Sequence, residues 1–179
     1  MVDLLFSLRS AAVYGLTLGL MVLGINEFHP LTPSRGKDLE ALRRAVAGFH
    51  DLSAAQASGF TTAVGDPTDG HTCLSTSAGG MGVHYLKKSL VDDTVIATQP
   101  EIMIYEPQND GSMKFVGVEY IIPYSIRGAD QPPPVLFGQA FMKIDHFQLW
   151  GLHAWVGREN SSGTFAMWNP DVSCQFAHS

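Results

Sequence analysis

Two stretches in the middle of the chain alternate apolar and polar residues in the way that is typical of β-strands. Residues 101–106 and 113–122 are rich in β-branched and aromatic residues. They flank Asn109-Asp110-Gly111, which is a strong short-range signal for a hairpin. A third stretch, residues 146–156, is rich in aromatic residues and is predicted to form a further strand.

The hairpin determines which side chains are expected to face one another. If residues 110–111 are the two central residues of the turn, Glu119 lies opposite Ile102, and Glu106 lies opposite Phe115. Alternation then places Glu119 on the same face as Phe115, and it places the two carboxylates on a common face. They would be about 14 Å apart along the strands, which is too far for both to bind one metal ion.

Apolar positions at spacings of three and four, with frequent alanine, predict a helix over residues 37–58. Gly48 predicts a break in this helix, and Gly59 predicts its end. The preceding residues 26–36 contain prolines and a glycine and are predicted to be a linker. Residues 60–82 are predicted to be a loop, because their many glycines indicate tight backbone turns. The spacing of these glycines fits no phosphate-binding motif.

The N-terminal residues carry the clearest targeting signal. Residues 11–25 contain no charge and follow Arg9. A helix of that length reaches about 22 Å, which is shorter than the hydrocarbon core of a membrane at about 30 Å. The length therefore favours a signal peptide over residues 1–25 and predicts an exported protein, either periplasmic or secreted. An uncleaved membrane anchor and a buried helix of a cytosolic protein are the alternatives.

A helix followed by successive antiparallel strands is typical of an α+β domain. We expect residues 37–179 to form one such domain, with the N-terminal helix packed on a curved antiparallel sheet or partial β-barrel. Hydrophobic residues make up 45% and charged residues 16% of the chain, which excludes a disordered protein. The net charge of −6 argues against nucleic acid as a partner, and membrane contact is expected only through an uncleaved N-terminal segment.

The chain contains two cysteines, Cys73 and Cys174, and no C-x-x-C motif. Their wide separation suits neither a thioredoxin-type redox site nor a zinc ribbon. In an oxidising compartment they are predicted to form a disulfide, which would close a loop of about 100 residues and contribute about 4.7 kcal/mol in the chain-entropy model. The alternative is two unrelated buried thiols.

Four polar residues stand out because their strand neighbours are apolar: His84, Glu106, Glu119 and His153. Of the two carboxylates, Glu119 is the better candidate for the core, because it lies deep in the longer strand and away from the turn. A carboxylate on an apolar face loses solvation energy unless something pairs with it. Two histidines and one carboxylate are a ligand set that suits Zn²⁺ with an open position, or non-haem Fe²⁺. The alternative is a hydrogen-bonded polar network in the core without a metal ion.

Further candidates for contacts to a small ligand are Glu106, Tyr85 and Trp155. The leading functional prediction is an exported protein of the cell envelope that binds a metal ion or a small ligand at the two histidines and Glu119. One alternative is a metal-dependent hydrolase or oxygenase that uses the same three residues. Another alternative is a structural or interaction module without a small-molecule site.

Several short segments of the chain resemble a group of small exported bacterial proteins that have no assigned activity. They are Gly79–Tyr85, Pro100–Pro107, Val118–Tyr120 and Leu152–Trp155, with Asn169-Pro170 and Cys174. The likeness covers about residues 45–175 and leaves out the apolar N-terminal segment. It implies export, pairing of the cysteines, and a place for His84, Glu119 and His153 in the pattern of the group. It implies no reaction, ligand or fold.

Overall fold

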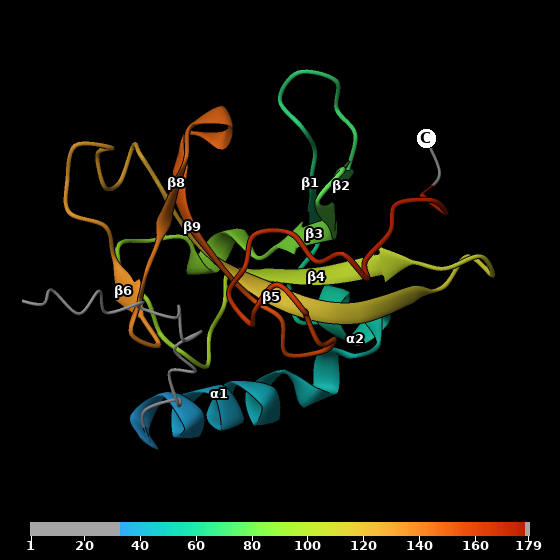
Figure 1. The fold of residues 1–179 in the computed structure, drawn as a ribbon, viewed down its shortest axis with the longest axis horizontal. Helices are drawn as coiled ribbons and strands as arrows, with labels where there is room; N and C mark the ends of the chain where they lie inside the picture. The colour runs from blue at the N-terminus through green and yellow to red at the C-terminus, as the bar shows by residue number, and fades with distance from the viewer. Residues whose placement is uncertain (1–32, 178–179) are drawn as a thin grey trace, which may run out of the picture. The chain divides into compact units, whose positions relative to one another are not determined.

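The N-terminal part of the computed structural model, which describes residues 33–177, is helical (Figure 1). Its elements are α1 (Pro33–Val46), the 3-10 turn η1 (Ala47–Phe49) and α2 (Leu52–Ala57). The buried face of α1 consists of Leu39, Leu42 and Val46, at the predicted spacings of three and four. The predicted break near Gly48 and the predicted end at Gly59 are both confirmed, and Gly59 has a positive φ of 101°.

The helix α1 begins earlier than predicted, so residues 33–36 of the predicted linker are helical. Proline is favourable in the first turn of a helix, because the N–H that it lacks would have no partner there. The other linker residues, 26–32, and the predicted signal peptide or membrane anchor, residues 1–25, lie outside the described residues. Within residues 33–177, no helix combines the length and the apolar character that a membrane crossing requires.

Seven strands form one antiparallel sheet in the order β1-β3-β4-β5-β9-β8, and β2 also pairs with β3. The α+β class is therefore confirmed, with an open sheet in which β1 and β8 are edge strands. The strands are β1 (Thr62–Val64), β2 (Cys73–Thr76), β3 (Gly79–Leu86), β4 (Ile102–Pro107), β5 (Met113–Pro123), β8 (Met142–Ile144) and β9 (Leu149–Ala154). The remaining elements are the two-stranded sheet of β6 (Val135–Leu136) and β7 (Gln139–Ala140), and the 3-10 turns η2 (Lys88–Leu90) and η3 (Asp145–Phe147).

Two predicted regions differ from the structure. Residues 60–82 were predicted to be a loop, which is wrong, because they contain β1, β2 and the first half of β3. These strands are short or rich in glycine, so the sequence shows no apolar alternation there. The strand predicted over residues 146–156 is confirmed only for Leu149–Ala154, since the preceding residues form η3 and Gln148 has a positive φ of 55°.

The turn between β4 and β5 is longer than the two-residue turn that we predicted. The N–H of Gln108 donates to the carbonyl of Ser112, so residues 109–111 form a three-residue turn that ends with Gly111 at a φ of 82°. As a result Glu106 lies opposite Lys114, and the predicted pairing of Glu106 with Phe115 is wrong.

A β-bulge in this hairpin restores the predicted register further from the turn. Tyr105 pairs with Phe115 and Ile104 pairs with Gly117, so β5 contains one extra residue between these pairs. Beyond the bulge Glu119 lies opposite Ile102, as predicted. The extra residue also reverses the alternation of side chains between the two faces of β5, so Phe115 packs on the face that the helices cover. Its predicted position on the same face as Glu119 is therefore wrong.

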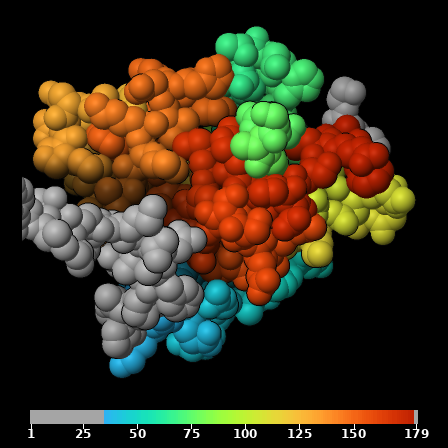
Figure 2. Space-filling model, viewed as in Figure 1, coloured from blue at the N-terminus to red at the C-terminus, as the bar shows by residue number. Residues whose placement is uncertain are grey.

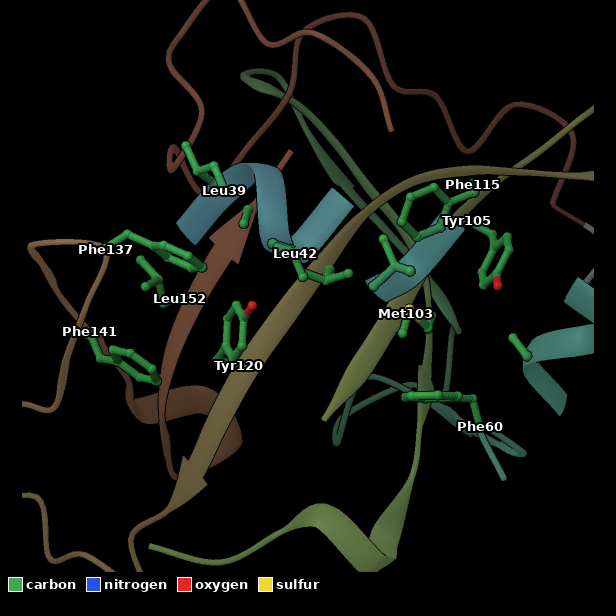
Figure 3. Packing of buried hydrophobic residues seen from close by; sticks show 14 of the residues in the cluster. Leu39, Leu42, Phe60, Met103, Tyr105, Phe115, Tyr120, Phe137, Phe141 and Leu152 are labelled. Atoms are coloured by element: carbon green, nitrogen blue, oxygen red, sulfur yellow. The ribbon is translucent and has the colours of Figure 1, made fainter. Parts of the chain in front are cut away.

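The two faces of the sheet bury different sets of side chains. On one face, side chains of α1 and of the strands form the main hydrophobic core, in which Leu42, Met103 and Tyr120 are buried (Figure 3). On the other face a smaller cluster contains Ile104 and Trp155. The C-terminal segment, red in Figure 2, covers the middle of the surface shown there.

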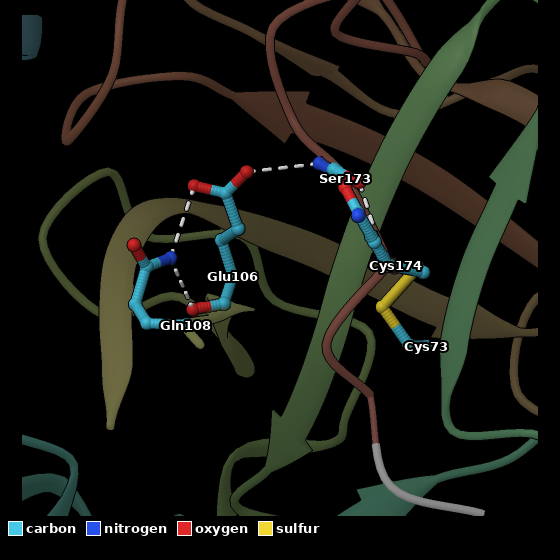
Figure 4. Close-up of a disulfide and its surroundings, with 6 residues drawn as sticks. Cys73, Glu106, Gln108, Ser173 and Cys174 are labelled. Atoms are coloured by element: carbon cyan, nitrogen blue, oxygen red, sulfur yellow. Dashed lines mark hydrogen bonds between the residues drawn. A yellow bond between two sulfur atoms is a disulfide. The ribbon is translucent and has the colours of Figure 1, made fainter. Parts of the chain in front are cut away.

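The C-terminal segment is fixed to the sheet by a disulfide and by a buried carboxylate. Cys73 in β2 and Cys174 form the predicted disulfide, with an S–S distance of 2.07 Å. Close to it, the carboxylate of Glu106 accepts a hydrogen bond of 2.9 Å from the N–H of Ser173 (Figure 4). The same carboxylate forms an ion pair with Arg158. The predicted disulfide is therefore confirmed, and the hydrogen bond and the ion pair of Glu106 lie close to it.

Candidate metal centre

His84, Glu119 and His153 come together on the face of the sheet that lies away from the helices. They belong to β3, β5 and β9, and Glu119 lies directly opposite His153 in the register of β5 and β9. His84 lies opposite Ile104 of β4, which separates β3 from β5. Three strand spacings, about 14 Å, separate the backbones of β3 and β9 in a flat sheet. The two imidazole side chains therefore have to lean toward each other across β4 and β5 to come into contact.

The three side chains are almost completely buried, with exposed fractions of 3% for His84, 5% for Glu119 and 1% for His153. The Nε2 atoms of the two histidines are 3.4 Å apart. Nε2 of His84 is 3.5 Å from Oε2 of Glu119, and Nδ1 of His153 is 3.9 Å from Oε1 of the same carboxylate. One ligand atom from each residue lies within 4.8 Å of the others.

These separations fit coordination of one ion better than they fit direct hydrogen bonding. Hydrogen bonds to nitrogen usually span about 2.7–3.2 Å, and the separations in this cluster are longer. Bonds of about 2.0–2.1 Å to a tetrahedral ion would hold two ligand atoms about 3.3–3.4 Å apart. The Nδ1 atoms of both histidines are buried without a hydrogen-bond partner among the described residues, but an ion bound by the two Nε2 atoms would leave them in the same state. The separations alone therefore favour an ion.

Burial changes the protonation of all three groups. Loss of solvation lowers the pKa of His84 to about 4, an effect that the backbone of Gly82 opposes. Burial, with a contribution from nearby His84, also lowers the pKa of His153 well below its usual value. Burial and the neighbouring Glu101 raise the pKa of Glu119 to about 8. The histidines are therefore neutral at pH 7, as metal ligands must be, whereas Glu119 has to lose a proton when an ion binds.

A second buried carboxylate, Glu101, supports the strand that carries Glu119. Its exposed fraction is 2%, and its Oε2 accepts a hydrogen bond of 3.1 Å from the N–H of Ile121. The side chain thus continues the ladder of β4 and β5 beyond Ile102, where β4 begins. Burial, with the nearby charge of Asp92, raises the pKa of Glu101 to about 7.

This raised pKa predicts a pH dependence of stability. Between pH 4.5 and 7 the folded chain keeps the proton on Glu101 while the unfolded chain releases it, so the free energy of unfolding falls as the pH rises. In the Glu101→Gln variant we expect the free energy of unfolding to fall less between pH 4.5 and 7, by about 2–3 kcal/mol, because the amide does not titrate. Urea unfolding of both proteins at several pH values measures it. Glu119 contributes a decrease of the same sign in both proteins. Because Glu101 also raises the pKa of Glu119, the difference between the curves reports Glu101 together with its effect on Glu119. Parallel curves would contradict the prediction.

An apolar cavity of about 200 Å³ lies beside the cluster. Only two of the residues that line it are polar, and they are His84 and Glu119. Its walls include Leu74 of β2 on one side and Ile144 and Phe147, at β8 and η3, on the other. The candidate metal ligands therefore border a space that a small molecule could occupy, which argues against the alternative of a structural module without a pocket.

An exposed ion pair joins the two walls of this cavity. Nε2 of His146, in η3, lies 2.8 Å from Oδ2 of Asp66, in the loop between β1 and β2. Phe147 of η3 lines the cavity, and so do Val64 and Leu74, the strand residues on either side of the loop. The loop and η3 lie against each other at the surface in Figure 2. The pair thus connects η3 with the loop between β1 and β2, and these two segments come from opposite edges of the sheet.

The absence of a side chain at Gly151 leaves room for the cluster. Gly151 lies two residues before His153 in β9, on the same face. A Cβ atom at this position would lie 2.8 Å from Oε1 of Glu119 and 2.5 Å from Cδ1 of Ile144. Glycine inside a strand indicates such a close approach. Gly151 therefore carries a signal for the site in the sequence, whereas Glu101 and the walls of the cavity become evident only in the structure.

The structure does not bring the three predicted ligand-contact residues together. Tyr85 follows His84 in β3 and therefore points to the opposite face, where it packs edge-on against Tyr105. Glu106 is bound by Arg158 and Ser173, near the disulfide. Trp155 is next to the cluster, because its ring stacks on His153 at a centroid distance of 5.8 Å and an angle of 11°. Its indole N–H donates to the carbonyl of Ala166.

Comparisons of the chain with protein-family models, with curated proteins and with solved structures found no match. The geometry of the cluster and of the cavity beside it is therefore the basis of the proposed function.

Proposed function

We propose that this protein is an exported metal-binding protein that holds one Zn²⁺ ion with His84, Glu119 and His153. The observation that carries the proposal is the spacing of the three side chains, since the closest ligand atoms are 3.4 and 3.5 Å apart. Two neutral imidazoles, one carboxylate and an open fourth position form a common Zn²⁺ site.

The disulfide favours Zn²⁺ over Fe²⁺ as the resident ion. A disulfide persists in oxidising compartments, and Cys73–Cys174 is formed in this chain. Fe²⁺ has an accessible higher oxidation state, whereas Zn²⁺ has no redox chemistry and keeps its charge in such a compartment. Export itself is supported by the disulfide and by the uncharged residues 11–25. The resemblance to small exported bacterial proteins agrees with this location.

The experiment is a measurement of Zn²⁺ binding by protein that is purified without an affinity tag and retains its disulfide. We expect one Zn²⁺ per chain by elemental analysis after dialysis. Titration against a chelator should show a loss of affinity of at least about 100-fold for His84→Ala and for Glu119→Gln, because each removes one of three ligands. Glu119→Gln is the sharper variant, since the amide keeps the size and shape of the side chain but cannot supply the negative charge of a metal-bound carboxylate.

A matched control is His71→Ala. His71 is exposed and pairs with Asp69 in the loop before β2, so this variant also removes a histidine but leaves the cluster intact. It should bind Zn²⁺ as the unaltered protein does. Folded Glu119→Gln protein with unchanged Zn²⁺ affinity, or unaltered protein that retains no stoichiometric metal, would overturn the proposal.

A further inference from the structure

We infer that the apolar cavity beside the cluster binds a small monoanion with an apolar body, whose charged group completes the coordination of the metal ion. The inference rests on the proposed function and adds the chemical class of the ligand. It starts from the composition of the cavity, in which His84 and Glu119 are the polar residues and all other lining residues are apolar. A ligand therefore meets polar groups at one point and hydrocarbon elsewhere.

The size of the cavity limits the apolar body. Its volume is about 200 Å³. For comparison, an engineered cavity of about 150 Å³ with walls of Leu, Ile and Phe stays dry and binds benzene. The cavity here is also lined by leucine, isoleucine and phenylalanine, among them Leu74, Ile144 and Phe147. A single six-membered ring or a short branched chain therefore fits, and its transfer from water into this space is favourable.

The charge of the site determines the other end of the ligand. A Zn²⁺ ion bound by two neutral histidines and the carboxylate of Glu119 leaves a net charge of +1. No other ionisable residue lines the cavity, and burial of an uncompensated charge is strongly unfavourable. One carboxylate or phenolate oxygen on the ligand neutralises the site and fills the open position. A dianion would again leave an uncompensated charge in the cavity, and a neutral molecule would not remove the existing one.

Benzoate is the probe that combines these properties, and acetate is its matched comparison, because it carries the same charged group without the ring. Zn²⁺ affinity is measured first, in the absence of either anion, and titration calorimetry of the loaded protein follows. We expect benzoate to bind at least about tenfold more tightly than acetate, because the ring enters the apolar cavity. We also expect benzoate to bind the loaded protein at least about tenfold more tightly than the metal-free protein.

Two variants separate the cavity from the metal site. Leu74→Trp fills the cavity from β2 with a residue that is not a metal ligand, and it should weaken benzoate binding by at least about tenfold with Zn²⁺ affinity preserved. Val135→Trp is the control, because Val135 has an exposed fraction of 60% and does not line the cavity.

The outcomes distinguish this inference from the proposed function. If Zn²⁺ binds but benzoate binds no better than acetate, the inference about the ligand fails and the metal site stands. The inference also fails if Leu74→Trp leaves benzoate affinity unchanged, or if benzoate binds equally well without the metal ion. Failure to bind Zn²⁺ before any anion is added overturns both.

Discussion

Replacing both cysteines, in the Cys73→Ala/Cys174→Ala variant, should lower the free energy of unfolding by about 4–5 kcal/mol. The two residues are 101 positions apart and are linked in the folded chain. Their cross-link restricts the unfolded chain, so its removal increases the entropy of the unfolded state more than that of the folded state. Using alanine at both positions avoids a free thiol. Guanidinium unfolding followed by circular dichroism gives the difference directly.

The loss should be largest for the C-terminal segment. Without the disulfide, this segment is held by the hydrogen bond from Ser173 to Glu106, by the burial of Val172 and by two backbone hydrogen bonds between Asn169 and Gly80 of β3. The fluorescence of the tryptophans, one of which is Trp155 in the same cluster as Val172, should therefore change at lower denaturant concentration than the circular dichroism of α1 and α2. A Ser75→Ala/Ser77→Ala variant is the control, since it changes two exposed positions next to Cys73. A loss below about 1 kcal/mol would contradict the expectation.

The sequence was sufficient to predict the α+β class, the disulfide and the three residues of the candidate metal centre. The class follows from the order of the predicted elements, and the disulfide follows from the presence of two widely separated cysteines without a C-x-x-C motif. His84, Glu119 and His153 are polar residues among apolar strand neighbours, and burying such residues has a large energetic cost unless they have partners. Their convergence depends on which face each strand presents, and the pairing of Glu119 with Ile102 was correct.

The features that were not predicted correctly depend on irregular backbone and on very short strands. The turn between β4 and β5 has three residues where two were predicted, so Glu106 and Phe115 were given wrong partners. The bulge in the same hairpin adds a residue that no local pattern marks, so Phe115 was placed on the wrong face. The strands β1, β2 and β8 have three or four residues each, which is too few to show a period. The cavity is formed between β2 and β8, at opposite ends of the sheet, so its walls could not be predicted either.

The disulfide and the candidate metal centre are structurally connected. Cys73 lies opposite Val83 in the pairing of β2 and β3, so the cross-linked residue is beside the strand position that precedes His84. Gly82, at a φ of 82°, lies at the register shift of the same strand pair, where a Cβ atom would be 2.5 Å from the carbonyl oxygen of Tyr105. The position of His84 thus depends on a strand that is held by a disulfide on one side and by β4 on the other.

Adding Zn²⁺ should raise the free energy of unfolding by about 4 kcal/mol when the free ion is at 1,000 times its dissociation constant. In the proposed site the ion would bind three side chains from β3, β5 and β9, which are far apart in the unfolded chain, so it would stabilise only the folded state. For a chain of this size the midpoint of thermal unfolding should rise by about 8–16 °C. Scanning calorimetry with and without Zn²⁺ measures the shift, and Mg²⁺, which prefers oxygen ligands, should produce none.

Gly151→Ala tests whether this stabilisation depends on the geometry of the cluster and not only on its ligands. The variant keeps all three ligands, but the new Cβ atom would lie 2.8 Å from Oε1 of Glu119, so the carboxylate has to move. Ile144 can turn away because the contact is with the end of its side chain. We therefore expect a folded protein that has lost most of the Zn²⁺-dependent increase in stability. An increase that equals that of the unaltered protein would mean that Zn²⁺ binds elsewhere, because an ion held by the Glu119 carboxylate cannot be indifferent to its displacement.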